Sequence, residues 1–213
     1  MNRAASPFRD RLELRLRHAG LTSMLQAGEF ERLEQYYQLL SRWNRRINLT
    51  SLALADFPDA TLDRLLVEPL LAASSLGDLP VSCFDLGSGG GSPAIPLKVV
   101  RPAIRLTMVE ASSKKAAFLR EAIHAVGLSE AVVLDARVEA LAHRVRAGSV
   151  EVVTVRALKI DEELIAAVTH LLKIGGRLLL FGSDAKPALP GFRIAEIRKL
   201  PGEGDSLSVL ERL

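Results

Sequence analysis

Apolar positions follow two different periods along the chain, one before about residue 76 and one after it. In the first part they recur every three or four residues, which is the spacing of one face of an α-helix. The segment FERLEQYYQLLSRWNRRINLT shows this best, with a face formed by Phe30, Leu33, Tyr37, Leu40, Asn44 and Ile47. Another helix is expected from about Phe57 to Ser75. Residues 1–76 are therefore predicted to form a helical N-terminal extension.

From residue 77 onward, short apolar runs alternate with helical segments. The runs are VSCFDLG, AIRLTMVE, EAVVLDA, VEVVTVRA and GRLLLFG, with helices expected at residues 93–100, 113–126, 138–146 and 161–172. Strands that are apolar throughout are typical of a parallel sheet covered on both faces. The last runs, GFRIAEIRKL and SLSVLERL, are separated only by PGEGD, which predicts a closing antiparallel pair. Residues 77–213 are thus predicted to form an α/β domain with a mostly parallel, Rossmann-like, seven-stranded sheet.

Composition narrows the class of protein. The chain has 213 residues, of which 48% are hydrophobic and 25% are charged, as in a globular domain of ordinary size. The single cysteine, Cys83, excludes an internal disulfide and a multi-cysteine metal site, and its apolar surroundings predict a core position. The first residues are too charged for a signal peptide, and no apolar run is long enough to cross a bilayer. We expect a cytoplasmic protein with no metal, no membrane partner and a monomeric state.

Positive charge is concentrated near the N-terminus. Residues 1–46 hold nine arginines against five acidic residues, although the net charge of the whole chain is only +3. Arginine also outnumbers lysine by 21 to 7. Because a planar guanidinium suits phosphate better than an ammonium does, this bias favours a nucleic-acid partner. A merely solvated basic face is the alternative.

A glycine-rich loop, FDLGSGGGSPAIP, follows the first predicted strand, where a doubly wound sheet binds its ligand. Gly87, Gly89 and Gly91 are spaced as G-x-G-x-G. A nicotinamide fingerprint would need a small residue at Ser92, so this spacing does not exclude one. A phosphate-binding P-loop is excluded because no lysine followed by serine or threonine closes the loop.

Two acidic residues flank the loop. Asp85 precedes the first glycine by two residues, where a carboxylate would repel a pyrophosphate but would suit the ammonium of S-adenosylmethionine. Glu110 ends the second predicted strand, 19 residues after Gly91, and can accept hydrogen bonds from ribose hydroxyls. Such a ribose occurs in both NAD and S-adenosylmethionine. The combination favours S-adenosylmethionine, while a glycine turn that holds no ligand is the structural alternative.

Five ordered motifs between Tyr37 and Gly182 resemble the RsmG (GidB) family of bacterial methyltransferases. They are WNRRINLT, DLGSGGGSPAIPL, KKAAFL, ARVE and VRAL. The resemblance implies the class I fold of enzymes that use S-adenosylmethionine, and methylation of guanine N7 in small-subunit (16S) ribosomal RNA. By position, the family's cofactor contacts fall on Gly87, Ser92, Glu110, Val138, Glu139 and Arg156. For the buried Arg156, a structural ion pair is the alternative.

The chain departs from the family pattern at several positions. Ser92 stands where a bulky residue is usual, Ala94 replaces a glycine, and Phe181 replaces a lysine. The family's R-H-x-x-D-S reads RLLVEP here, without the histidine and with the acid moved or lost (residues 67–69). These departures are expected to bear on the RNA side of the site.

The implied chemistry needs no catalytic side chain. Guanine N7 carries an in-plane lone pair and no proton, so no general base is expected and catalysis is placement in line with the methyl carbon. The sequence VRALK after the fourth strand also lacks the Asn/Asp-Pro-Pro-aromatic turn of enzymes that methylate exocyclic amines. Phosphates of 16S ribosomal RNA or the small subunit would meet candidate cations at Arg42, Arg45, Arg46, Lys114, Lys115 and Lys159.

Three alternatives stay open at this point. The first is an S-adenosylmethionine-dependent methyltransferase acting on another RNA position or on a small molecule, which the departures favour. The second is a nicotinamide-dependent oxidoreductase, against which the missing catalytic acid counts. The third is an RNA-binding module without turnover, against which the intact loop from Asp85 to Gly91 counts.

Overall fold

The computed structural model of the chain describes residues 6–76, 81–182, 189–202 and 205–213. Its centre is one seven-stranded sheet in the order β3-β2-β1-β4-β5-β7-β6. The first five strands pair in parallel, and β7 joins β5 and β6 in antiparallel register, as predicted for the last two runs. The strands are β1 Ser82–Leu86, β2 Arg105–Glu110, β3 Ala131–Asp135, β4 Val150–Arg156, β5 Leu172–Gly182, β6 Phe192–Lys199 and β7 Ser206–Arg212.

Helices cover the two faces of the sheet unequally. On one face lie the N-terminal helices with α5 (Ala94–Val100) and α6 (Ser113–Val126), and their apolar side chains share one core with Cys83 and Met108 of the strands. On the other face lie the short 3₁₀ helix η2 (Val138–His143) and α7 (Glu162–Leu171). The helix expected at residues 161–172 therefore ends one residue early, because β5 already begins at Leu172.

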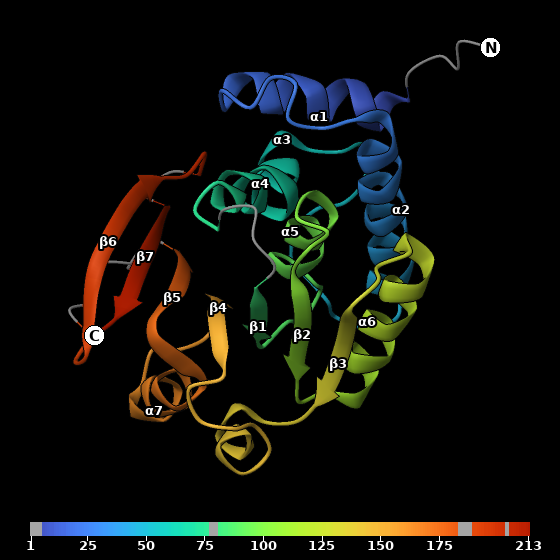
Figure 1. Cartoon of the computed structure of the whole chain (residues 1–213). Coiled ribbons are helices and arrows are strands. Elements are labelled where there is room, and N and C mark those ends of the chain that lie inside the picture. The colour runs from blue at the N-terminus through green and yellow to red at the C-terminus, as the bar shows by residue number, and fades with distance from the viewer. Residues whose placement is uncertain (1–5, 77–80, 183–188, 203–204) are drawn as a thin grey trace.

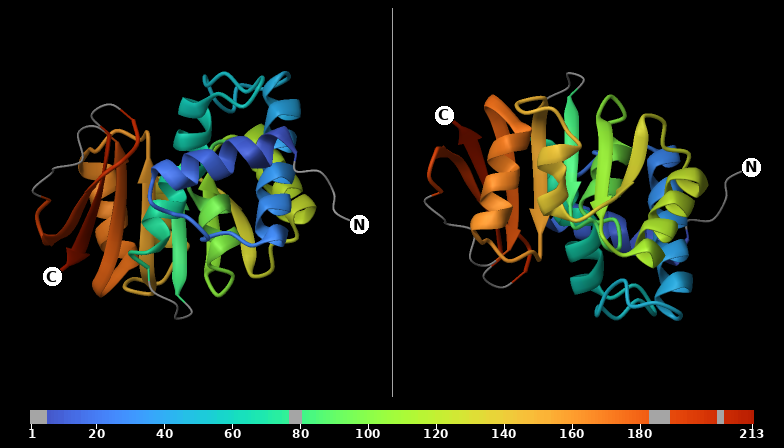
Figure 2. Two further views of the ribbon diagram at one scale, coloured as in Figure 1. Left: turned by 90° about the horizontal axis from the view of Figure 1, so that it is seen from above. Right: turned by 90° about the horizontal axis from the view of Figure 1, so that it is seen from below.

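The N-terminal extension is helical, as predicted. It contains α1 (Pro7–His18) and α2 (Ala27–Asn44), and α2 packs beside α6 on the side of the molecule opposite β6 and β7 (Figures 1 and 2). Phe30, Leu33, Tyr37 and Leu40 of the predicted face are buried, whereas α2 ends at Asn44, so Ile47 lies beyond the helix and is half-buried. The Asn44 Oδ1 accepts hydrogen bonds from the backbone of Leu49 and Thr50, at 2.9 and 3.0 Å, and so folds the loop that follows α2.

The segment expected as one helix from 57 to 75 is bent into three parts. These are α3 (Asp59–Leu62), a π-helical turn η1 (Asp63–Val67) and α4 (Glu68–Ala73). In the π turn the Glu68 N–H donates to the carbonyl of Asp63, five residues back, so the Arg64 carbonyl loses its usual donor. Pro69 has no N–H to offer the Leu65 carbonyl. Two backbone acceptors are thereby freed, at the kind of π bulge that is frequent at functional sites.

The predicted boundary near residue 76 adjoins residues 77–80, which lie outside the described part of the chain. Side chains from both sides of this boundary belong to one continuous core, so the helices pack on the sheet as a cover. No helix within the described ranges is long and apolar enough to cross a membrane. Those ranges also contain no cluster of three or more His, Cys, Asp or Glu that could hold a metal ion.

Candidate active site

A cavity of about 600 Å³ opens at the carboxyl ends of β1, β2, β3 and β4, where a doubly wound sheet binds its ligand. We call its two extremes the β4 end (Arg64, Ser92, Arg156 and Ala157) and the β3 end (Ala136, Arg137, Val138 and Glu139). Between them lie the glycine loop and Glu110, and the loop after α2 contributes Thr50, Ser51 and Leu52 to the wall. The N-terminal extension is therefore part of the site.

The glycine loop needs its glycines for two different reasons. Gly87 has φ +69°, and a Cβ there would lie 2.8 Å from a methyl group of Leu158. Gly91 has φ +87°, and a Cβ there would lie 2.5 Å from Ile95. Gly87 lines the cavity, whereas Gly91 is buried behind the loop against α5. The first glycine thus leaves the ligand side open, and the last lets the helix pack closely.

Tyr36 of α2 fixes the loop from the other side. Its hydroxyl donates to the carbonyl of Gly90 across 2.6 Å, although 54 residues separate the two. The ring is fully buried, and burial raises the pKa of this phenol, so it stays a neutral donor. The apolar period of α2 did not single out Tyr36, because a buried tyrosine resembles any other core residue in such a pattern.

Asp85 lies under the glycine loop and does not line the cavity. One carboxylate oxygen accepts a hydrogen bond of 2.6 Å from Thr154 of β4, and the other is buried without a partner among the described residues. Burial raises the pKa of Asp85 to about 6. The orphaned oxygen is a buried acceptor that a cationic ligand group above the loop would stabilise.

Glu110 ends β2 as predicted and closes the middle of the cavity. One of its oxygens accepts from the N–H of Gly89 at 2.9 Å, and the other accepts from Ser112 at 2.8 Å. The carboxylate therefore ties the glycine loop to the start of α6 and keeps lone pairs for a ligand. Val138 and Glu139, after β3, line the cavity beside it.

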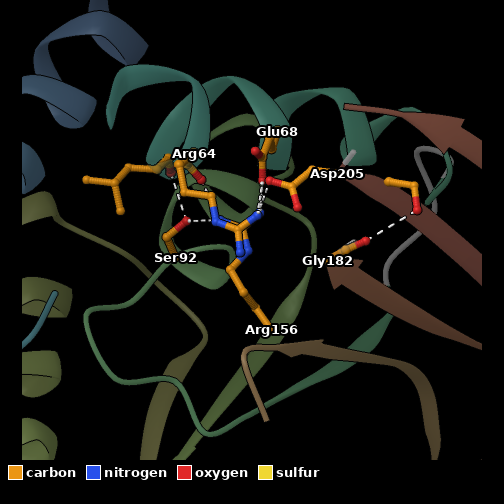
Figure 3. Close-up of polar contacts among 8 residues, drawn as sticks. Arg64, Glu68, Ser92, Arg156, Gly182 and Asp205 are labelled. Atoms are coloured by element: carbon orange, nitrogen blue, oxygen red, sulfur yellow. Dashed lines mark hydrogen bonds and ion pairs between the residues drawn. The ribbon is translucent and has the colours of Figure 1, made fainter. Parts of the chain in front are cut away.

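The β4 end is built around a buried ion pair. Arg156 donates to Glu68 across 2.8 Å and to the Ser92 hydroxyl across 3.1 Å (Figure 3). Its guanidinium also lies 4.4 Å from the Phe181 ring centre. It also donates to the carbonyl of Arg64, one of the acceptors freed by the π turn. Burial lowers the pKa of Arg156 to about 10, and it raises the pKa of Glu68.

This ion pair corrects one expectation. The acid of R-H-x-x-D-S was expected to be moved or lost, yet Glu68 stands four residues after Arg64, at the spacing of that acid, and holds Arg156. Ser92, another of the departures, uses its hydroxyl to donate to the freed carbonyl of Leu65 at 2.9 Å. Sequence reasoning missed Glu68 because one extra methylene and a following proline disguised the motif.

The sequence-based site residues fall into three groups. Those that line the cavity are Gly87, Gly89, Ser92, Glu110, Lys115, Val138, Glu139 and Arg156. Those buried outside the cavity are Asp85 and Gly91. The remaining RNA candidates are exposed and lie outside the cavity: Arg42, Arg45, Arg46, Lys114 and Lys159.

The cavity fits the cofactor expected from the sequence. It offers a carboxylate after β2 for ribose hydroxyls, an apolar wall at Val138 for a base, and a buried unpaired oxygen of Asp85 beneath the loop. At the end of β4, Ala157 adopts φ 57°, a left-handed conformation that a non-glycine residue rarely takes. Backbone strain of this kind is common where a chain lines a ligand site.

Comparisons with known proteins agree with this geometry. The family model described as "rRNA small subunit methyltransferase G" matches residues 29–187. The protein of that name from Xanthomonas axonopodis pv. citri (strain 306) is 38% identical over 192 residues, covering 84% of this chain and 85% of the relative. Its counterpart from Stenotrophomonas maltophilia (strain K279a) is 38% identical over 183 residues, covering 84% and 79%.

A solved structure of a SAM-dependent methyltransferase from Aquifex aeolicus shares the fold. Its TM-score is 0.58 at 13% identity, over 72% of this chain and 93% of that one. Together with the family match, this agrees with the class I methyltransferase fold expected from the sequence. The chain is a methyltransferase that uses S-adenosylmethionine, and it belongs to the rRNA small subunit methyltransferase G family.

Proposed function

We propose that this protein transfers a methyl group from S-adenosylmethionine to N7 of a guanine in small-subunit ribosomal RNA. The observation that carries the proposal is the single cavity that joins Glu110, the glycine loop and Arg156 to the loop after α2. The names of its relatives support the choice of small-subunit RNA. The cofactor contacts proposed are the cavity-lining residues Gly87, Gly89, Glu110, Val138 and Glu139. Of the other residues expected from the sequence, Ser92 and Arg156 shape the cavity wall, Asp85 acts from beneath the loop, and Gly91 is buried behind it.

The residues of the cavity act by positioning. S-adenosylmethionine, when bound, supplies an electrophilic methyl group. Glu110 is oriented by two backbone N–H groups, so it accepts ribose hydroxyls without having to reorganise. Asp85 offers negative charge from beneath the loop. N7 needs no proton removed, and the cavity accordingly relies on placement, with the wall of Thr50, Ser51 and Leu52 available to exclude water from the base.

RNA is proposed to approach over six cations, of which five are exposed and Lys115 is half-buried. Arg42, Arg45 and Arg46 extend from the end of α2, Lys114 and Lys115 lie at the start of α6, and Lys159 follows β4. Lys115 also lines the cavity, so this surface reaches the site entrance. Phosphate contacts from such residues position an RNA without reading its sequence, and the target base has to be splayed out of a helix to enter.

The deciding experiment is nucleoside mass spectrometry of small-subunit RNA after incubation with the protein and labelled S-adenosylmethionine. We expect labelled 7-methylguanosine. A matched control is Gly87→Val, which adds a Cβ against Leu158 in a left-handed backbone and is expected to abolish labelling. Another methylated nucleoside in place of 7-methylguanosine would overturn the N7 assignment and favour a different RNA position.

A further inference from the structure

Four cationic side chains line the cavity within the described ranges: Arg64, Lys115, Arg137 and Arg156. The sheet order β3-β2-β1-β4 distributes them along it. Arg137 follows β3 and Lys115 lies just after β2, so both are on the side where Glu110 and Val138 suit an adenosine. Arg64 and Arg156 are at the β4 end, the side left for the methionine half of S-adenosylmethionine.

Arg156 has little left to offer a ligand. Its two terminal nitrogens are hydrogen-bonded to Glu68, Ser92 and the Arg64 carbonyl, and its Nε, which has no partner within the described residues, is buried out of reach of a ligand in the cavity. Phe181 covers one face of the guanidinium, and only 9% of the side chain is exposed. Arg156 therefore acts as a brace of the cavity wall.

Arg64 is arranged in the opposite way. Only its Nη1 is engaged, by Glu68 at 3.3 Å and by Asp205 at 3.1 Å (Figure 3). Its Nε and Nη2 have no partner within the described part of the chain, and 27% of the side chain is exposed. These two nitrogens form the edge of a guanidinium that matches the two oxygens of a carboxylate. Glu68 and Asp205 hold the Arg64 guanidinium at Nη1 and leave the edge formed by Nε and Nη2 free.

We propose that Arg64 binds the carboxylate of the methionine half of S-adenosylmethionine through Nε and Nη2. Arg156 supports it by holding the Arg64 backbone carbonyl, and Glu68 and Asp205 fix its rotamer in advance, which lowers the entropy lost on binding. The proposal rests on the cofactor placement of the proposed function and is independent of which RNA atom is methylated.

The test compares S-adenosylmethionine with its decarboxylated form, which lacks only the carboxylate, by titration calorimetry without RNA. Arg64→Gln is expected to lower the affinity for S-adenosylmethionine by roughly 10-fold to 100-fold, the range of a charge-assisted hydrogen bond. The affinity for the decarboxylated form is expected to change by less than about 2-fold in the same variant, since a lost partner matters only where it was used. Arg64→Lys, which keeps the charge without the fork, is expected to fall between wild type and Arg64→Gln.

Arg137→Gln is the matched control, because it removes a cavity-lining arginine from the β3 end. It is expected to leave the ratio of the two affinities unchanged. Equal losses for both ligands in Arg64→Gln and Arg64→Lys would overturn the proposal and leave Arg64 a structural brace. Unchanged affinities together with a weaker salt dependence of RNA binding would also overturn it, in favour of an RNA phosphate contact. None of these outcomes depends on the nucleoside analysis, so the two proposals can fail separately.

Discussion

The two ends of the cavity present polar groups to a ligand in opposite ways. At the β4 end, Arg156 is buried and hydrogen-bonded to Glu68, to Ser92 and to the freed carbonyl of Arg64, while the partly exposed Arg64 side chain is held by Glu68 and Asp205. At the β3 end, Arg137 and Glu139 are exposed, and neither forms an ion pair with another residue of the described ranges. The β4 end is thus preorganised before a ligand arrives, whereas the β3 end can adapt to one.

The difference shows in the protonation of the groups. Burial lowers the pKa of Arg156 and raises those of Glu68 and Asp85, so each of these charges is costly unless its neighbours compensate it. Burying these charged groups therefore lowers the free energy of unfolding, but it holds the side chains of the β4 end in a fixed geometry. Removing a group from the β4 end should have a large effect on folding, and removing one from the β3 end should have a small one.

The largest effect is expected for Arg156→Leu. The change leaves Glu68 buried with only the longer contact to Arg64, and breaking one partner of a buried pair destabilises by about 3 to 5 kcal/mol. The free energy of unfolding, measured by urea denaturation, should fall by about that amount. Arg137→Leu, the counterpart at the β3 end, should change it by less than about 0.5 kcal/mol. Similar losses in both variants would erase the contrast between the ends.

A pH-dependent effect of intermediate size is expected for Asp85→Asn. The folded-state pKa of about 6 lies above the ordinary aspartate pKa of 3.8, so the native protein binds this proton more tightly than the unfolded chain does. Stability contributed by the protonated form is present at low pH and is lost as pH rises through about 6. Asparagine cannot ionise, so the variant escapes this loss.

The measurement is the difference in unfolding free energy between Asp85→Asn and wild type. It should shift in favour of the variant by on the order of 2 to 3 kcal/mol between pH 4 and pH 7. A constant offset from the buried amide cancels in this comparison. Asp135→Asn, which removes an exposed carboxylate at the end of β3, is the exposed counterpart in the same comparison. A flat difference for Asp85→Asn would mean that its carboxylate is compensated within the fold.

The smallest effect on stability is expected for substitutions of two neighbouring tyrosines of α2, Tyr36 and Tyr37. Tyr36→Phe removes the hydrogen bond to Gly90 in the glycine loop, and Tyr37→Phe removes a bond of 2.9 Å to the carbonyl of Leu54. Each should cost about 1 kcal/mol of unfolding free energy. Only Tyr36→Phe should also weaken binding of S-adenosylmethionine, by severalfold in calorimetry. Equal binding in both variants would show that the extension does not shape the loop.

Most of the fold was predictable because its signals are local. Continuous apolar strands, glycines and the PGEGD sequence lie within short windows, and they predicted the parallel sheet and the antiparallel β6 and β7 correctly. The bend at residues 63–67 was not predicted, because a π turn depends on one displaced hydrogen bond that no period reveals. Pro69 was its one visible sign, and prolines are tolerated in first turns of ordinary helices too.

The residues that face the ligand were largely predictable from the sequence, whereas the residues that support them were less so. Gly87, Glu110 and Val138 were found because the loop and strand ends have recognisable spacing. The partners of Arg156 were not, since Glu68 is 88 residues away in sequence and meets it only through the fold. Arg64 was noticed only as part of an altered motif. Its importance depends on which of its nitrogens remain free, and this requires the three-dimensional arrangement.

The contact between Arg64 and Asp205 joins an early part of the chain to a late one, so it can form only after the late part has been synthesised. A chain emerges from the ribosome with its N-terminus first, so Arg64, Glu68 and Arg156 all emerge before Asp205 does. A chain halted ahead of the closing hairpin would retain the glycine loop and yet lack one of the two carboxylates behind Arg64. Full readiness of the site therefore requires that translation has passed the codon of Asp205.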